Sequence, residues 1–433
     1  MSCRLTTTLV ALAVTTGSSF LSISAAETVT SEVSSYQQAH PAPDLKTALM
    51  QVWAHNADVQ AARAKLAASN ARVQSSKRAR YNPELALAEE RVGNEVTREI
   101  GLDYAIDWSG KRVAQEVTAS AERDALQAQL VLTEQEIAVQ FLQAVVRYHA
   151  TREIAQRNHQ RVQLMTQFAE LADKRLRVGD INQIERDLAA LAQQEAIAQL
   201  AEAESSLAEA EQQLRVVGID EAMLPDIFVG ELPAMTTPVS DEQFRRHPRV
   251  RRAQYDVAAA QSRVTQVDRE RKPDPVLSWR TGSKEIDGER DTLQSIGISI
   301  PLPLFNSGGD EVKAAHADSD VAQAELTSLL RQLRAQIAQS ASRYNALRRA
   351  QQLWRESPAS HFTARANLLQ KMWEAGELST ADYLVQLNQT IENDLRGREL
   401  QSQVRLSYLD WLNNSGEFFN WALFPADRVS DGH

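Results

Sequence analysis

The chain has 433 residues, a formal net charge of -10 and a sequence pI of about 5.5. This acidic balance argues against a nucleic-acid-binding protein, because such proteins are usually basic. The single cysteine, Cys3, excludes a disulfide framework and a thiolate metal site.

The first 26 residues have the pattern of a secretory signal. Arg4 supplies the positive start, residues 9–14 (LVALAV) the apolar region, and Ser24-Ala25-Ala26 a small-residue cleavage site. The apolar run is too short, and too rich in Thr and Ser, for an uncleaved anchor. No cysteine follows residue 26, so we expect an exported chain without a lipid anchor. The rest contains no run of about 18 consecutive apolar residues, so no membrane-spanning helix is predicted.

The remainder of the chain repeats one plan twice. A proline, a Ser-Gly pair and a glycine recur in order, at Pro83, Ser109-Gly110 and Gly179, and again at Pro275, Ser307-Gly308 and Gly376. From Pro83 to Ser109 is 26 residues and from Pro275 to Ser307 is 32, so the second copy carries its main insertion here. The repeats are predicted to span residues 27–217 and 245–416.

Each copy contains a predicted pair of strands, at about 83–108 and 275–302. Alternation with period two places apolar side chains on one face of each pair. These side chains are Ile100, Leu102, Tyr104, Ile106 and Trp108 in the first copy, and Leu277, Trp279, Ile296, Ile298, Ile300 and Leu302 in the second. Gly93-Asn94 predicts a turn, and the charged stretch Gly282–Asp291 predicts a longer loop that holds the insertion. Such strands suit a transmembrane barrel, and the pattern alone equally allows a small soluble sheet.

The other segments are predicted to be helical. Long helices are expected over 111–178 and 310–375, and shorter ones over 57–80, 180–216, 248–272 and 377–415. In each copy the two shorter helices together are nearly as long as the long helix. Two short helices laid end to end would therefore cover it. Heptad spacing of Leu and Ala between Leu200 and Val217 predicts coiled-coil packing. A single helical hairpin cannot bury all of these heptad residues, which implies that further helices pack beside it.

Two segments interrupt the helical pattern. Residues 218–244 contain three prolines and two glycines and could be a plain linker. The apolar residues Met223, Leu224, Ile227 and Phe228 favour a partly buried segment that packs midway along the helices. We expect the C-terminal tail, 417–433, to pack at the same level.

Three motifs carry a resemblance to a known family: DWSGKRVAQ at 107–115, RKPDPVLS at 271–278 and ISIPLPLFNSGG at 298–309. With them, residues 44–416 resemble the outer-membrane efflux proteins, the TolC-like channel-tunnels, and within these the heavy-metal branch that serves cobalt-zinc-cadmium type RND exporters. Ser109 stands where that branch usually has a glycine, and Leu176 where an aromatic residue often precedes the helical tip. Trp373 fits the pattern in the second copy.

The resemblance implies a mainly α-helical fold with a small β part. Long α-helical hairpins would form a periplasmic tunnel, and four β-strands per chain would contribute to a trimeric, twelve-stranded outer-membrane barrel. The chain would be the passive exit duct of a tripartite efflux system for heavy-metal cations. Its partners would be a periplasmic adaptor (membrane fusion) protein, an inner-membrane RND pump, outer-membrane lipid and two further copies of itself.

The competing interpretation is a soluble periplasmic coiled-coil interaction or adaptor protein. An adaptor has one hairpin between Gly-rich β modules, whereas this chain has two hairpins and two strand pairs. The sequence therefore favours the channel.

The turns between helices are the predicted functional tips. Gly179 and Gly376 would end the descending helices as left-handed caps, and Asp180 and Glu377 would begin the ascending ones. The resemblance makes these four residues the predicted adaptor contacts.

Another acid, Glu185 or Asp382, follows each of these glycines by six residues. In a solvated hairpin both would be ordinary surface residues. Their duplication, and the match of Asp382 to the family's acidic aperture position, make them the predicted periplasmic gate. Six carboxylates around a narrow axis would favour cations.

The sequence shows no enzyme motif. Its eight histidines have neither the close spacing of metal ligands nor a helical pairing, and no phosphate-binding glycine loop or nucleophile motif occurs. We expect no catalytic residue, no resident metal or cofactor, and no nucleic-acid partner.

Overall fold

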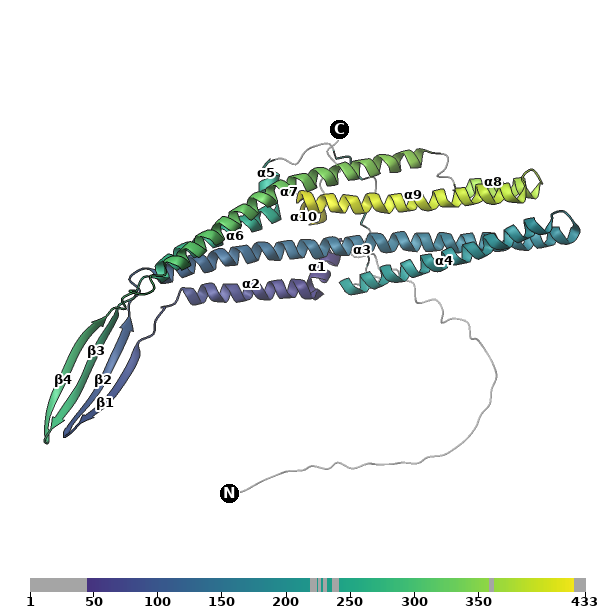
Figure 1. The fold of residues 1–433 in the computed structure, drawn as a ribbon. Coiled ribbons are helices and arrows are strands. Elements are labelled where there is room, and N and C mark those ends of the chain that lie inside the picture. Colours follow the sequence, from purple (N-terminus) through teal and green to yellow (C-terminus); the bar gives the residue numbers. More distant parts are fainter. Residues whose placement is uncertain are drawn as a thin grey trace, which may run out of the picture. The chain divides into compact units, whose positions relative to one another are not determined.

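The structure, a computed structural model, describes residues 45–218, 224, 227–228, 232–235, 241–357 and 362–423. The predicted signal, residues 1–26, lies outside them. The described residues form helices and one sheet, labelled in Figure 1. In chain order the elements are α1 Leu45–His55, α2 Ala57–Ser76, β1 Glu84–Val92, β2 Glu95–Ala105, α3 Lys111–Val178, α4 Gln183–Val217, α5 Asp241–Arg246, α6 Pro248–Glu270, β3 Val276–Ile286, β4 Glu289–Ser299, α7 Gly309–Glu356, α8 Phe362–Glu374, α9 Thr380–Ser415 and α10 Phe418–Leu423. None of these helices is both long enough and apolar enough to cross a membrane.

Helix α3 organises the helical part. It has 68 residues and covers the predicted range, so it spans roughly 100 Å. Helices α2, α4, α6 and α9 all pack against it. In Figure 1, α2 and α4 follow one another along α3, which confirms that two short helices cover one long one.

The prediction of one helix over 310–375 is wrong. Helix α7 ends at Glu356, and Ser357 has the extended backbone angles φ -79° and ψ 143°. The next residue in the sequence is Pro358. A proline disfavours helical geometry at the residue before it, which explains the break. The sequence reasoning also missed α1, which buries Ala48, Leu49 and Val52.

The seam of α4 is made of small residues. Its buried alanines, Ala189, Ala196, Ala203 and Ala210, recur every seventh residue. The predicted heptad pattern therefore extends back toward the start of the helix. Alanine at these positions lets the backbone of α4 approach α3 closely.

The main core surrounds the middle of α3. Its large buried side chains include Leu49, Phe141, Leu142, Tyr148, Tyr344, Leu409 and Phe418. The described residues of the connecting segment pack against this core: Leu224, Ile227, Phe228, Leu232 and Met235. The Tyr344 hydroxyl donates to the Pro233 carbonyl at 2.6 Å, and Asn345 exchanges two hydrogen bonds with the Met235 backbone. Phe418 and Ala422 place α10 in the same core, whereas Met223 lies outside the described residues.

The four strands form one antiparallel sheet in the order β1-β2-β3-β4. Gly93-Asn94 connects β1 to β2, as predicted, and the two residues Asp287-Gly288 connect β3 to β4. The predicted long loop at Gly282–Asp291 is therefore wrong, because most of these residues continue the strands. Opposite charges face each other there, in the pairs Lys284↔Asp291 and Glu285↔Arg290.

The insertion in the second copy lies mainly after the sheet. The β3–β4 hairpin covers residues 276–299 and the β1–β2 hairpin 84–105, so the second is only two residues longer (24 against 22). From Ala105 to Ser109 is four residues, whereas from Ser299 to Ser307 is eight. Most of the extra length thus falls in residues 300–306, between β4 and α7.

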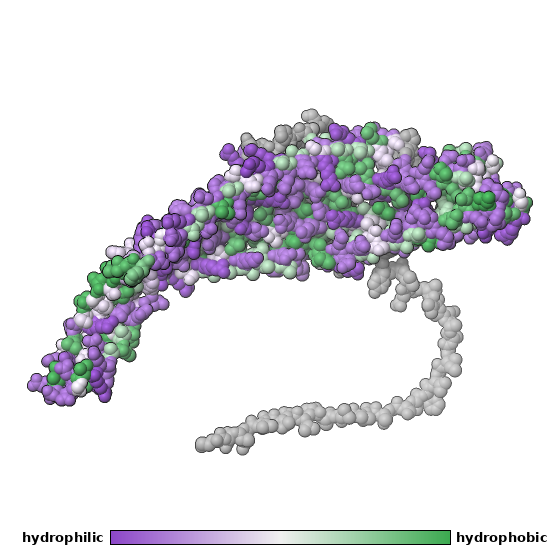
Figure 2. Space-filling model, in the orientation of Figure 1, coloured by the Kyte–Doolittle hydropathy of each residue, from purple (hydrophilic) through white to green (hydrophobic). Residues whose placement is uncertain are grey.

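The two faces of the sheet differ in chemistry. The strand pairing aligns Leu85, Leu102, Trp279 and Ile296 in one row across all four strands. All four side chains are exposed, and Figure 2 shows hydrophobic residues over the sheet and at its end beside the helices. The next row of the register, Glu84, Asp103, Ser278 and Gly297, belongs to the other face and is polar.

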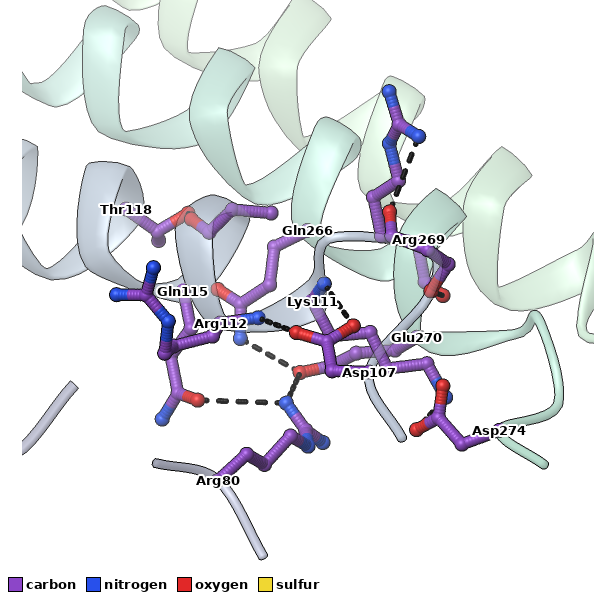
Figure 3. Close-up of polar contacts among 12 residues, drawn as sticks. Arg80, Asp107, Lys111, Arg112, Gln115, Thr118, Gln266, Arg269, Glu270 and Asp274 are labelled. Atoms are coloured by element: carbon purple, nitrogen blue, oxygen red, sulfur yellow. Dashed lines mark hydrogen bonds and ion pairs between the residues drawn. The ribbon is translucent and has the colours of Figure 1, made fainter. Parts of the chain in front are cut away.

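A polar cluster fixes the sheet to the helices (Figure 3). Asp107 accepts hydrogen bonds from the backbone N–H groups of Lys111 and Arg112, which caps α3. The Lys111 ammonium lies 2.8 Å from an Asp274 carboxylate oxygen, and both side chains are less than a tenth exposed. The Tyr81 hydroxyl donates to the same oxygen. The segments that enter β1, leave β2 and enter β3 are thus joined at one buried point.

His247 joins α6 to the end of α9. Its Nδ1 accepts the backbone N–H of Arg249, so it is the N-cap of α6, and its Nε2 donates to the Asn414 carbonyl at 3.1 Å. Burial lowers the pKa of His247 from 6.5 to about 4. The imidazole is therefore neutral in the folded chain at neutral pH.

Acidification is expected to weaken the fold through His247. Below pH 6.5 the unfolded chain binds a proton at this residue, which the folded chain does not bind until about pH 4, so the free energy of unfolding falls in this window. The full difference in pKa corresponds to at most about 3 kcal/mol. Thermal unfolding followed by circular dichroism across this pH range measures the loss.

A matched pair of variants separates this effect from general acid sensitivity. His247→Asn keeps a capping side chain, like Asn56 at the start of α2, and should flatten the acid part of the curve. His55→Asn removes an exposed histidine and should leave the curve as it is. Equal acid sensitivity in all three proteins would refute the role of His247.

Candidate functional site: the helical tips

The first tip connects α3 to α4. Gly179 has φ +82°, and its N–H and that of Asp180 donate to the carbonyls of Leu176 and Arg175. These two bonds satisfy carbonyl groups at the end of α3 that have no partner within the helix. The predicted left-handed glycine cap is present.

The second tip, between α8 and α9, has the same design. Gly376 has φ +78°, and its N–H donates to the Trp373 carbonyl at 3.0 Å. The Glu377 N–H donates to the Met372 carbonyl at 2.8 Å. The duplicated sequence pattern therefore folds into duplicated turns.

The ascending helices begin later than predicted. Asp180 and Glu377 lie within the turns, where their backbone N–H groups complete the caps of the preceding helices. Helix α4 starts after the N-cap Asn182, and α9 after the N-cap Ser379. The prediction that Asp180 and Glu377 begin these helices is wrong, because their backbone N–H groups bond to the preceding helices, and the Asn182 and Ser379 side chains cap the following ones.

Glu185 and Asp382 occupy equivalent capping positions. The Glu185 carboxylate accepts the Asn182 N–H at 3.0 Å, and Asn182 accepts the Glu185 N–H, which is a capping box. The Asp382 carboxylate accepts the Ser379 hydroxyl at 2.7 Å, and the same hydroxyl oxygen accepts the Asp382 N–H. Each acid thus stabilises the first turn of its helix, a role that the sequence reasoning did not assign.

An aromatic cluster lies behind the tips. The rings of Phe168, Trp373 and Tyr383 lie 4.5–5.3 Å from one another and come from α3, α8 and α9. Arg175 of α3 lies 4.6 Å from the centre of the Trp373 ring and donates to the carbonyls of Trp373 and Glu374. The two hairpins are therefore held together at this end.

Most of this cluster was missed from the sequence. Trp373 was noted only as a family feature, and Arg175 was not noted at all. The sequence signal for Arg175 is its position in the last turn of α3, where a positive charge interacts favourably with the helix dipole. Its partner on the other hairpin could not be read from the sequence.

The described residues contain no group of three or more His, Cys, Asp or Glu side chains arranged to hold a metal ion. The tips are formed by left-handed glycine turns and by the helix caps that follow them.

Comparison with known proteins gives one curated relative. No protein-family model matches the chain. The cobalt-zinc-cadmium resistance protein CzcC of Cupriavidus metallidurans is 25% identical over 249 residues, which is 56% of this chain and 59% of CzcC. The match thus spans less than two thirds of the relative's length.

Solved structures agree over much more of the chain. The Campylobacter jejuni outer membrane channel CmeC superposes with a TM-score of 0.73 at 13% identity, over 86% of this chain and 85% of CmeC. The Vibrio cholerae outer membrane protein VceC gives 0.69 at 19% identity, over 86% of this chain and 96% of VceC. This chain has the TolC-like channel fold. The resemblance to outer-membrane channels and the predicted mainly α-helical fold with a small β part are confirmed.

Both tips depend on glycines with positive φ, which a substitution can test. A Cβ added at Gly376 would meet no atom within 4 Å, so the cost of a side chain there is purely conformational. Gly376→Val is expected to lower the free energy of unfolding by about 1–3 kcal/mol, because valine disfavours the left-handed region. Thermal or denaturant unfolding measures the change.

Two comparison variants define the cause. Gly376→Asn should recover most of the loss, since asparagine tolerates this backbone conformation. Gly309→Ala, at a glycine without positive φ and with room for a Cβ, should be close to neutral. If Val and Asn destabilise equally, backbone strain is not the reason for Gly376.

Proposed function

We propose that this protein is the outer-membrane channel of a tripartite efflux system. It would act as a passive exit duct for substrates delivered by an inner-membrane RND pump and a periplasmic adaptor. Three copies would assemble, with a twelve-stranded barrel in the outer membrane and a helical tunnel in the periplasm.

The two-faced sheet carries this proposal. Its exposed apolar face suits lipid, its polar face suits a water-filled interior, and β1 and β4 are its two edges. Exposed sheet edges promote association with other strands, and closure of a barrel removes them. The match to outer-membrane channels over most of the chain supports the same arrangement.

The charge of the polar face supports a cationic substrate. Strand pairing places seven acids on this face: Glu84, Glu90, Glu95, Glu99, Asp103, Glu289 and Asp291. The same face carries two cations, Arg280 and Lys284. Each pairs with an acid of the neighbouring strand, Arg280 with Asp103 and Lys284 with Glu95. An interior with this excess of acids favours cations. The similarity to a cobalt-zinc-cadmium resistance protein supports heavy-metal cations as the substrate class.

The tips complete the proposal. Gly179, Asp180, Gly376 and Glu377 would contact the adaptor, and Glu185 and Asp382 would line the periplasmic gate. The capping role of the two acids is compatible with the gate, because the cap hydrogen bonds hold both carboxylates in fixed positions at the tips.

Assembly is the direct test. Light scattering of the purified protein in detergent, corrected for bound detergent, is expected to give three chains per particle. A stable monomer would exclude the barrel.

The two faces of the sheet should respond differently to charge. Ile296→Arg places a charge on the apolar face and should cost about 2–4 kcal/mol per chain near the middle of the bilayer, so little protein should reach the outer membrane as a trimer. Ser295→Arg places the same charge on the polar face and should be tolerated. Membrane fractionation with detection of the trimer compares them, and equal yields would contradict the assignment of the faces.

The gate is tested by removing charge while keeping the caps. Glu185→Gln with Asp382→Asn retains hydrogen-bonding side chains at both capping positions. In planar bilayers this double variant should be less cation-selective and less blocked by a trivalent cation than the original channel, because six charges are lost from each trimer.

The turn acids supply the matched control. Asp180→Asn with Glu377→Gln removes six charges from the neighbouring turns and should change selectivity much less. If both double variants behave alike, the acids at the two capping positions do not form the gate.

A further inference from the structure

We propose that the junction between the sheet and the helices binds phospholipid headgroups of the periplasmic leaflet of the outer membrane. Residues 300–306 and Trp108 would lie at the boundary between acyl chains and headgroups. Lys77, Arg78 and Arg269 would contact lipid phosphates. This inference rests on the proposed function, because it requires the apolar face of the sheet to contact lipid.

The apolar face of the sheet continues beyond the last strand pairs. After β2 it includes Ile106 and Trp108, and after β4 it includes Ile300, Leu302 and Leu304, all of them exposed. Phe305 is fully exposed. The greater part of the insertion that distinguishes the second copy lies here, so the added residues extend the apolar surface. Figure 2 shows hydrophobic residues at this end of the sheet.

This surface is held in place. The Trp108 indole N–H donates to the Pro273 carbonyl at 2.7 Å, which fixes a ring that stays 62% exposed. In the 300–306 segment, the Leu304 N–H donates to the Leu302 carbonyl, and the Asn306 side chain accepts the Gly308 N–H. Fixed and exposed aromatic rings at the end of an apolar band are typical of a membrane interface.

Cations gather directly beside this surface. The segments that join the strands to the helices, together with the adjoining helix ends, contain Lys77, Arg78, Arg80, Lys111, Arg112, Arg269, Arg271 and Lys272. The opposite end of the sheet, around the turns at Gly93 and Gly288, carries an excess of acids. Cations at one end of an apolar band suit anionic headgroups there.

Three of these cations form no ion pair among the described residues. Lys111, Arg112, Arg271 and Lys272 each form an ion pair, and Arg80 lies 3.9 Å from Glu270. Lys77, Arg78 and Arg269 are exposed and have no carboxylate partner among the described residues. Among the described residues the Arg269 guanidinium donates to the Ser109 carbonyl, which leaves other N–H groups of its guanidinium for a phosphate.

The three lie at one level of the molecule. The Lys77 carbonyl accepts from Arg112 at the start of α3, and the Arg269 carbonyl accepts from Ser109 just before it. Gly308, at the start of α7, packs against Arg271 at the end of α6. The cations and the exposed apolar residues therefore border the same junction.

Spin labelling tests the apolar part. The only cysteine, Cys3, lies in the predicted signal, so Phe305→Cys should give one labelled site in the mature chain. In trimers reconstituted into phosphatidylethanolamine–phosphatidylglycerol vesicles, the label should be accessible to oxygen, with a depth near the headgroups. A label shielded from both oxygen and a water-soluble nickel complex would place Phe305 against a neighbouring copy and overturn the proposal. A label accessible mainly to nickel would place it in water, with the same consequence.

A second label distinguishes this failure from failure of the proposed function. Ile296→Cys lies on the apolar face of the sheet and should be oxygen-accessible at greater depth. If Ile296 contacts lipid and Phe305 does not, the headgroup site alone is wrong. If neither does, the membrane arrangement itself is wrong.

Lipid binding tests the cations. Native mass spectrometry of trimers with phosphatidylglycerol should show roughly a hundredfold weaker binding for Lys77→Ala with Arg78→Ala and Arg269→Ala, because each cation near an anionic surface contributes about 1 kcal/mol. The control, Lys65→Ala with Arg331→Ala and Arg349→Ala, removes three exposed cations elsewhere on the helices and should bind as the original does. Equal binding by both triple variants would overturn the assignment of these cations.

Discussion

The structure depends on one constraint: a sheet whose apolar face is left uncovered by its own chain. Leu85, Leu102, Trp279 and Ile296 would be buried in an ordinary soluble sheet, yet all four are exposed here. Water penalises such a surface in proportion to its area. The arrangement is stable only where something apolar covers that face, and this requirement is the physical basis of the proposed membrane setting.

The junction between the sheet and the helices fixes how this sheet is held. Every connection between the sheet and a helix passes through a short segment, and the buried Lys111–Asp274 pair lies between three of them. A buried ion pair gains little net stability, since desolvation of the charges offsets much of their attraction. Its directional contacts nevertheless define how neighbouring segments meet. With Asp107 capping α3 nearby, the helices leave the sheet in fixed directions, and the exposed residues of the junction keep fixed positions.

Periodicity and duplication predicted much of the fold. The 68-residue α3, the paired strands with one apolar face, and the glycine turns follow from local chemistry that a sequence displays directly. Errors arose where a single residue or a partner decides the outcome. The break after Glu356 depends on one proline, Pro358, and the charged stretch after Gly282 forms strands in which opposite charges face each other. The bond from Arg175 to the other hairpin is a contact between distant parts of the chain, which periodicity cannot show.

At the candidate site, too, some features were predicted from local sequence and others were missed. The tip glycines were predicted because positive φ leaves a strong signal in sequence. The capping function of Glu185 and Asp382 was overlooked, although Asn182 and Ser379 stand three residues before them. Helix initiation therefore explains why these acids are duplicated.

Helix α3 gives the first repeat a continuous mechanical connection. It is one helix from the junction to its tip, so bending it anywhere strains a ladder of backbone hydrogen bonds. The second repeat uses two separate helices on this side, α7 and α8. Arg175, at the end of α3, donates to the carbonyls of Trp373 and Glu374 on the second tip. A sideways force on the second tip would therefore be passed through this contact to α3, and α3 would carry it to the junction.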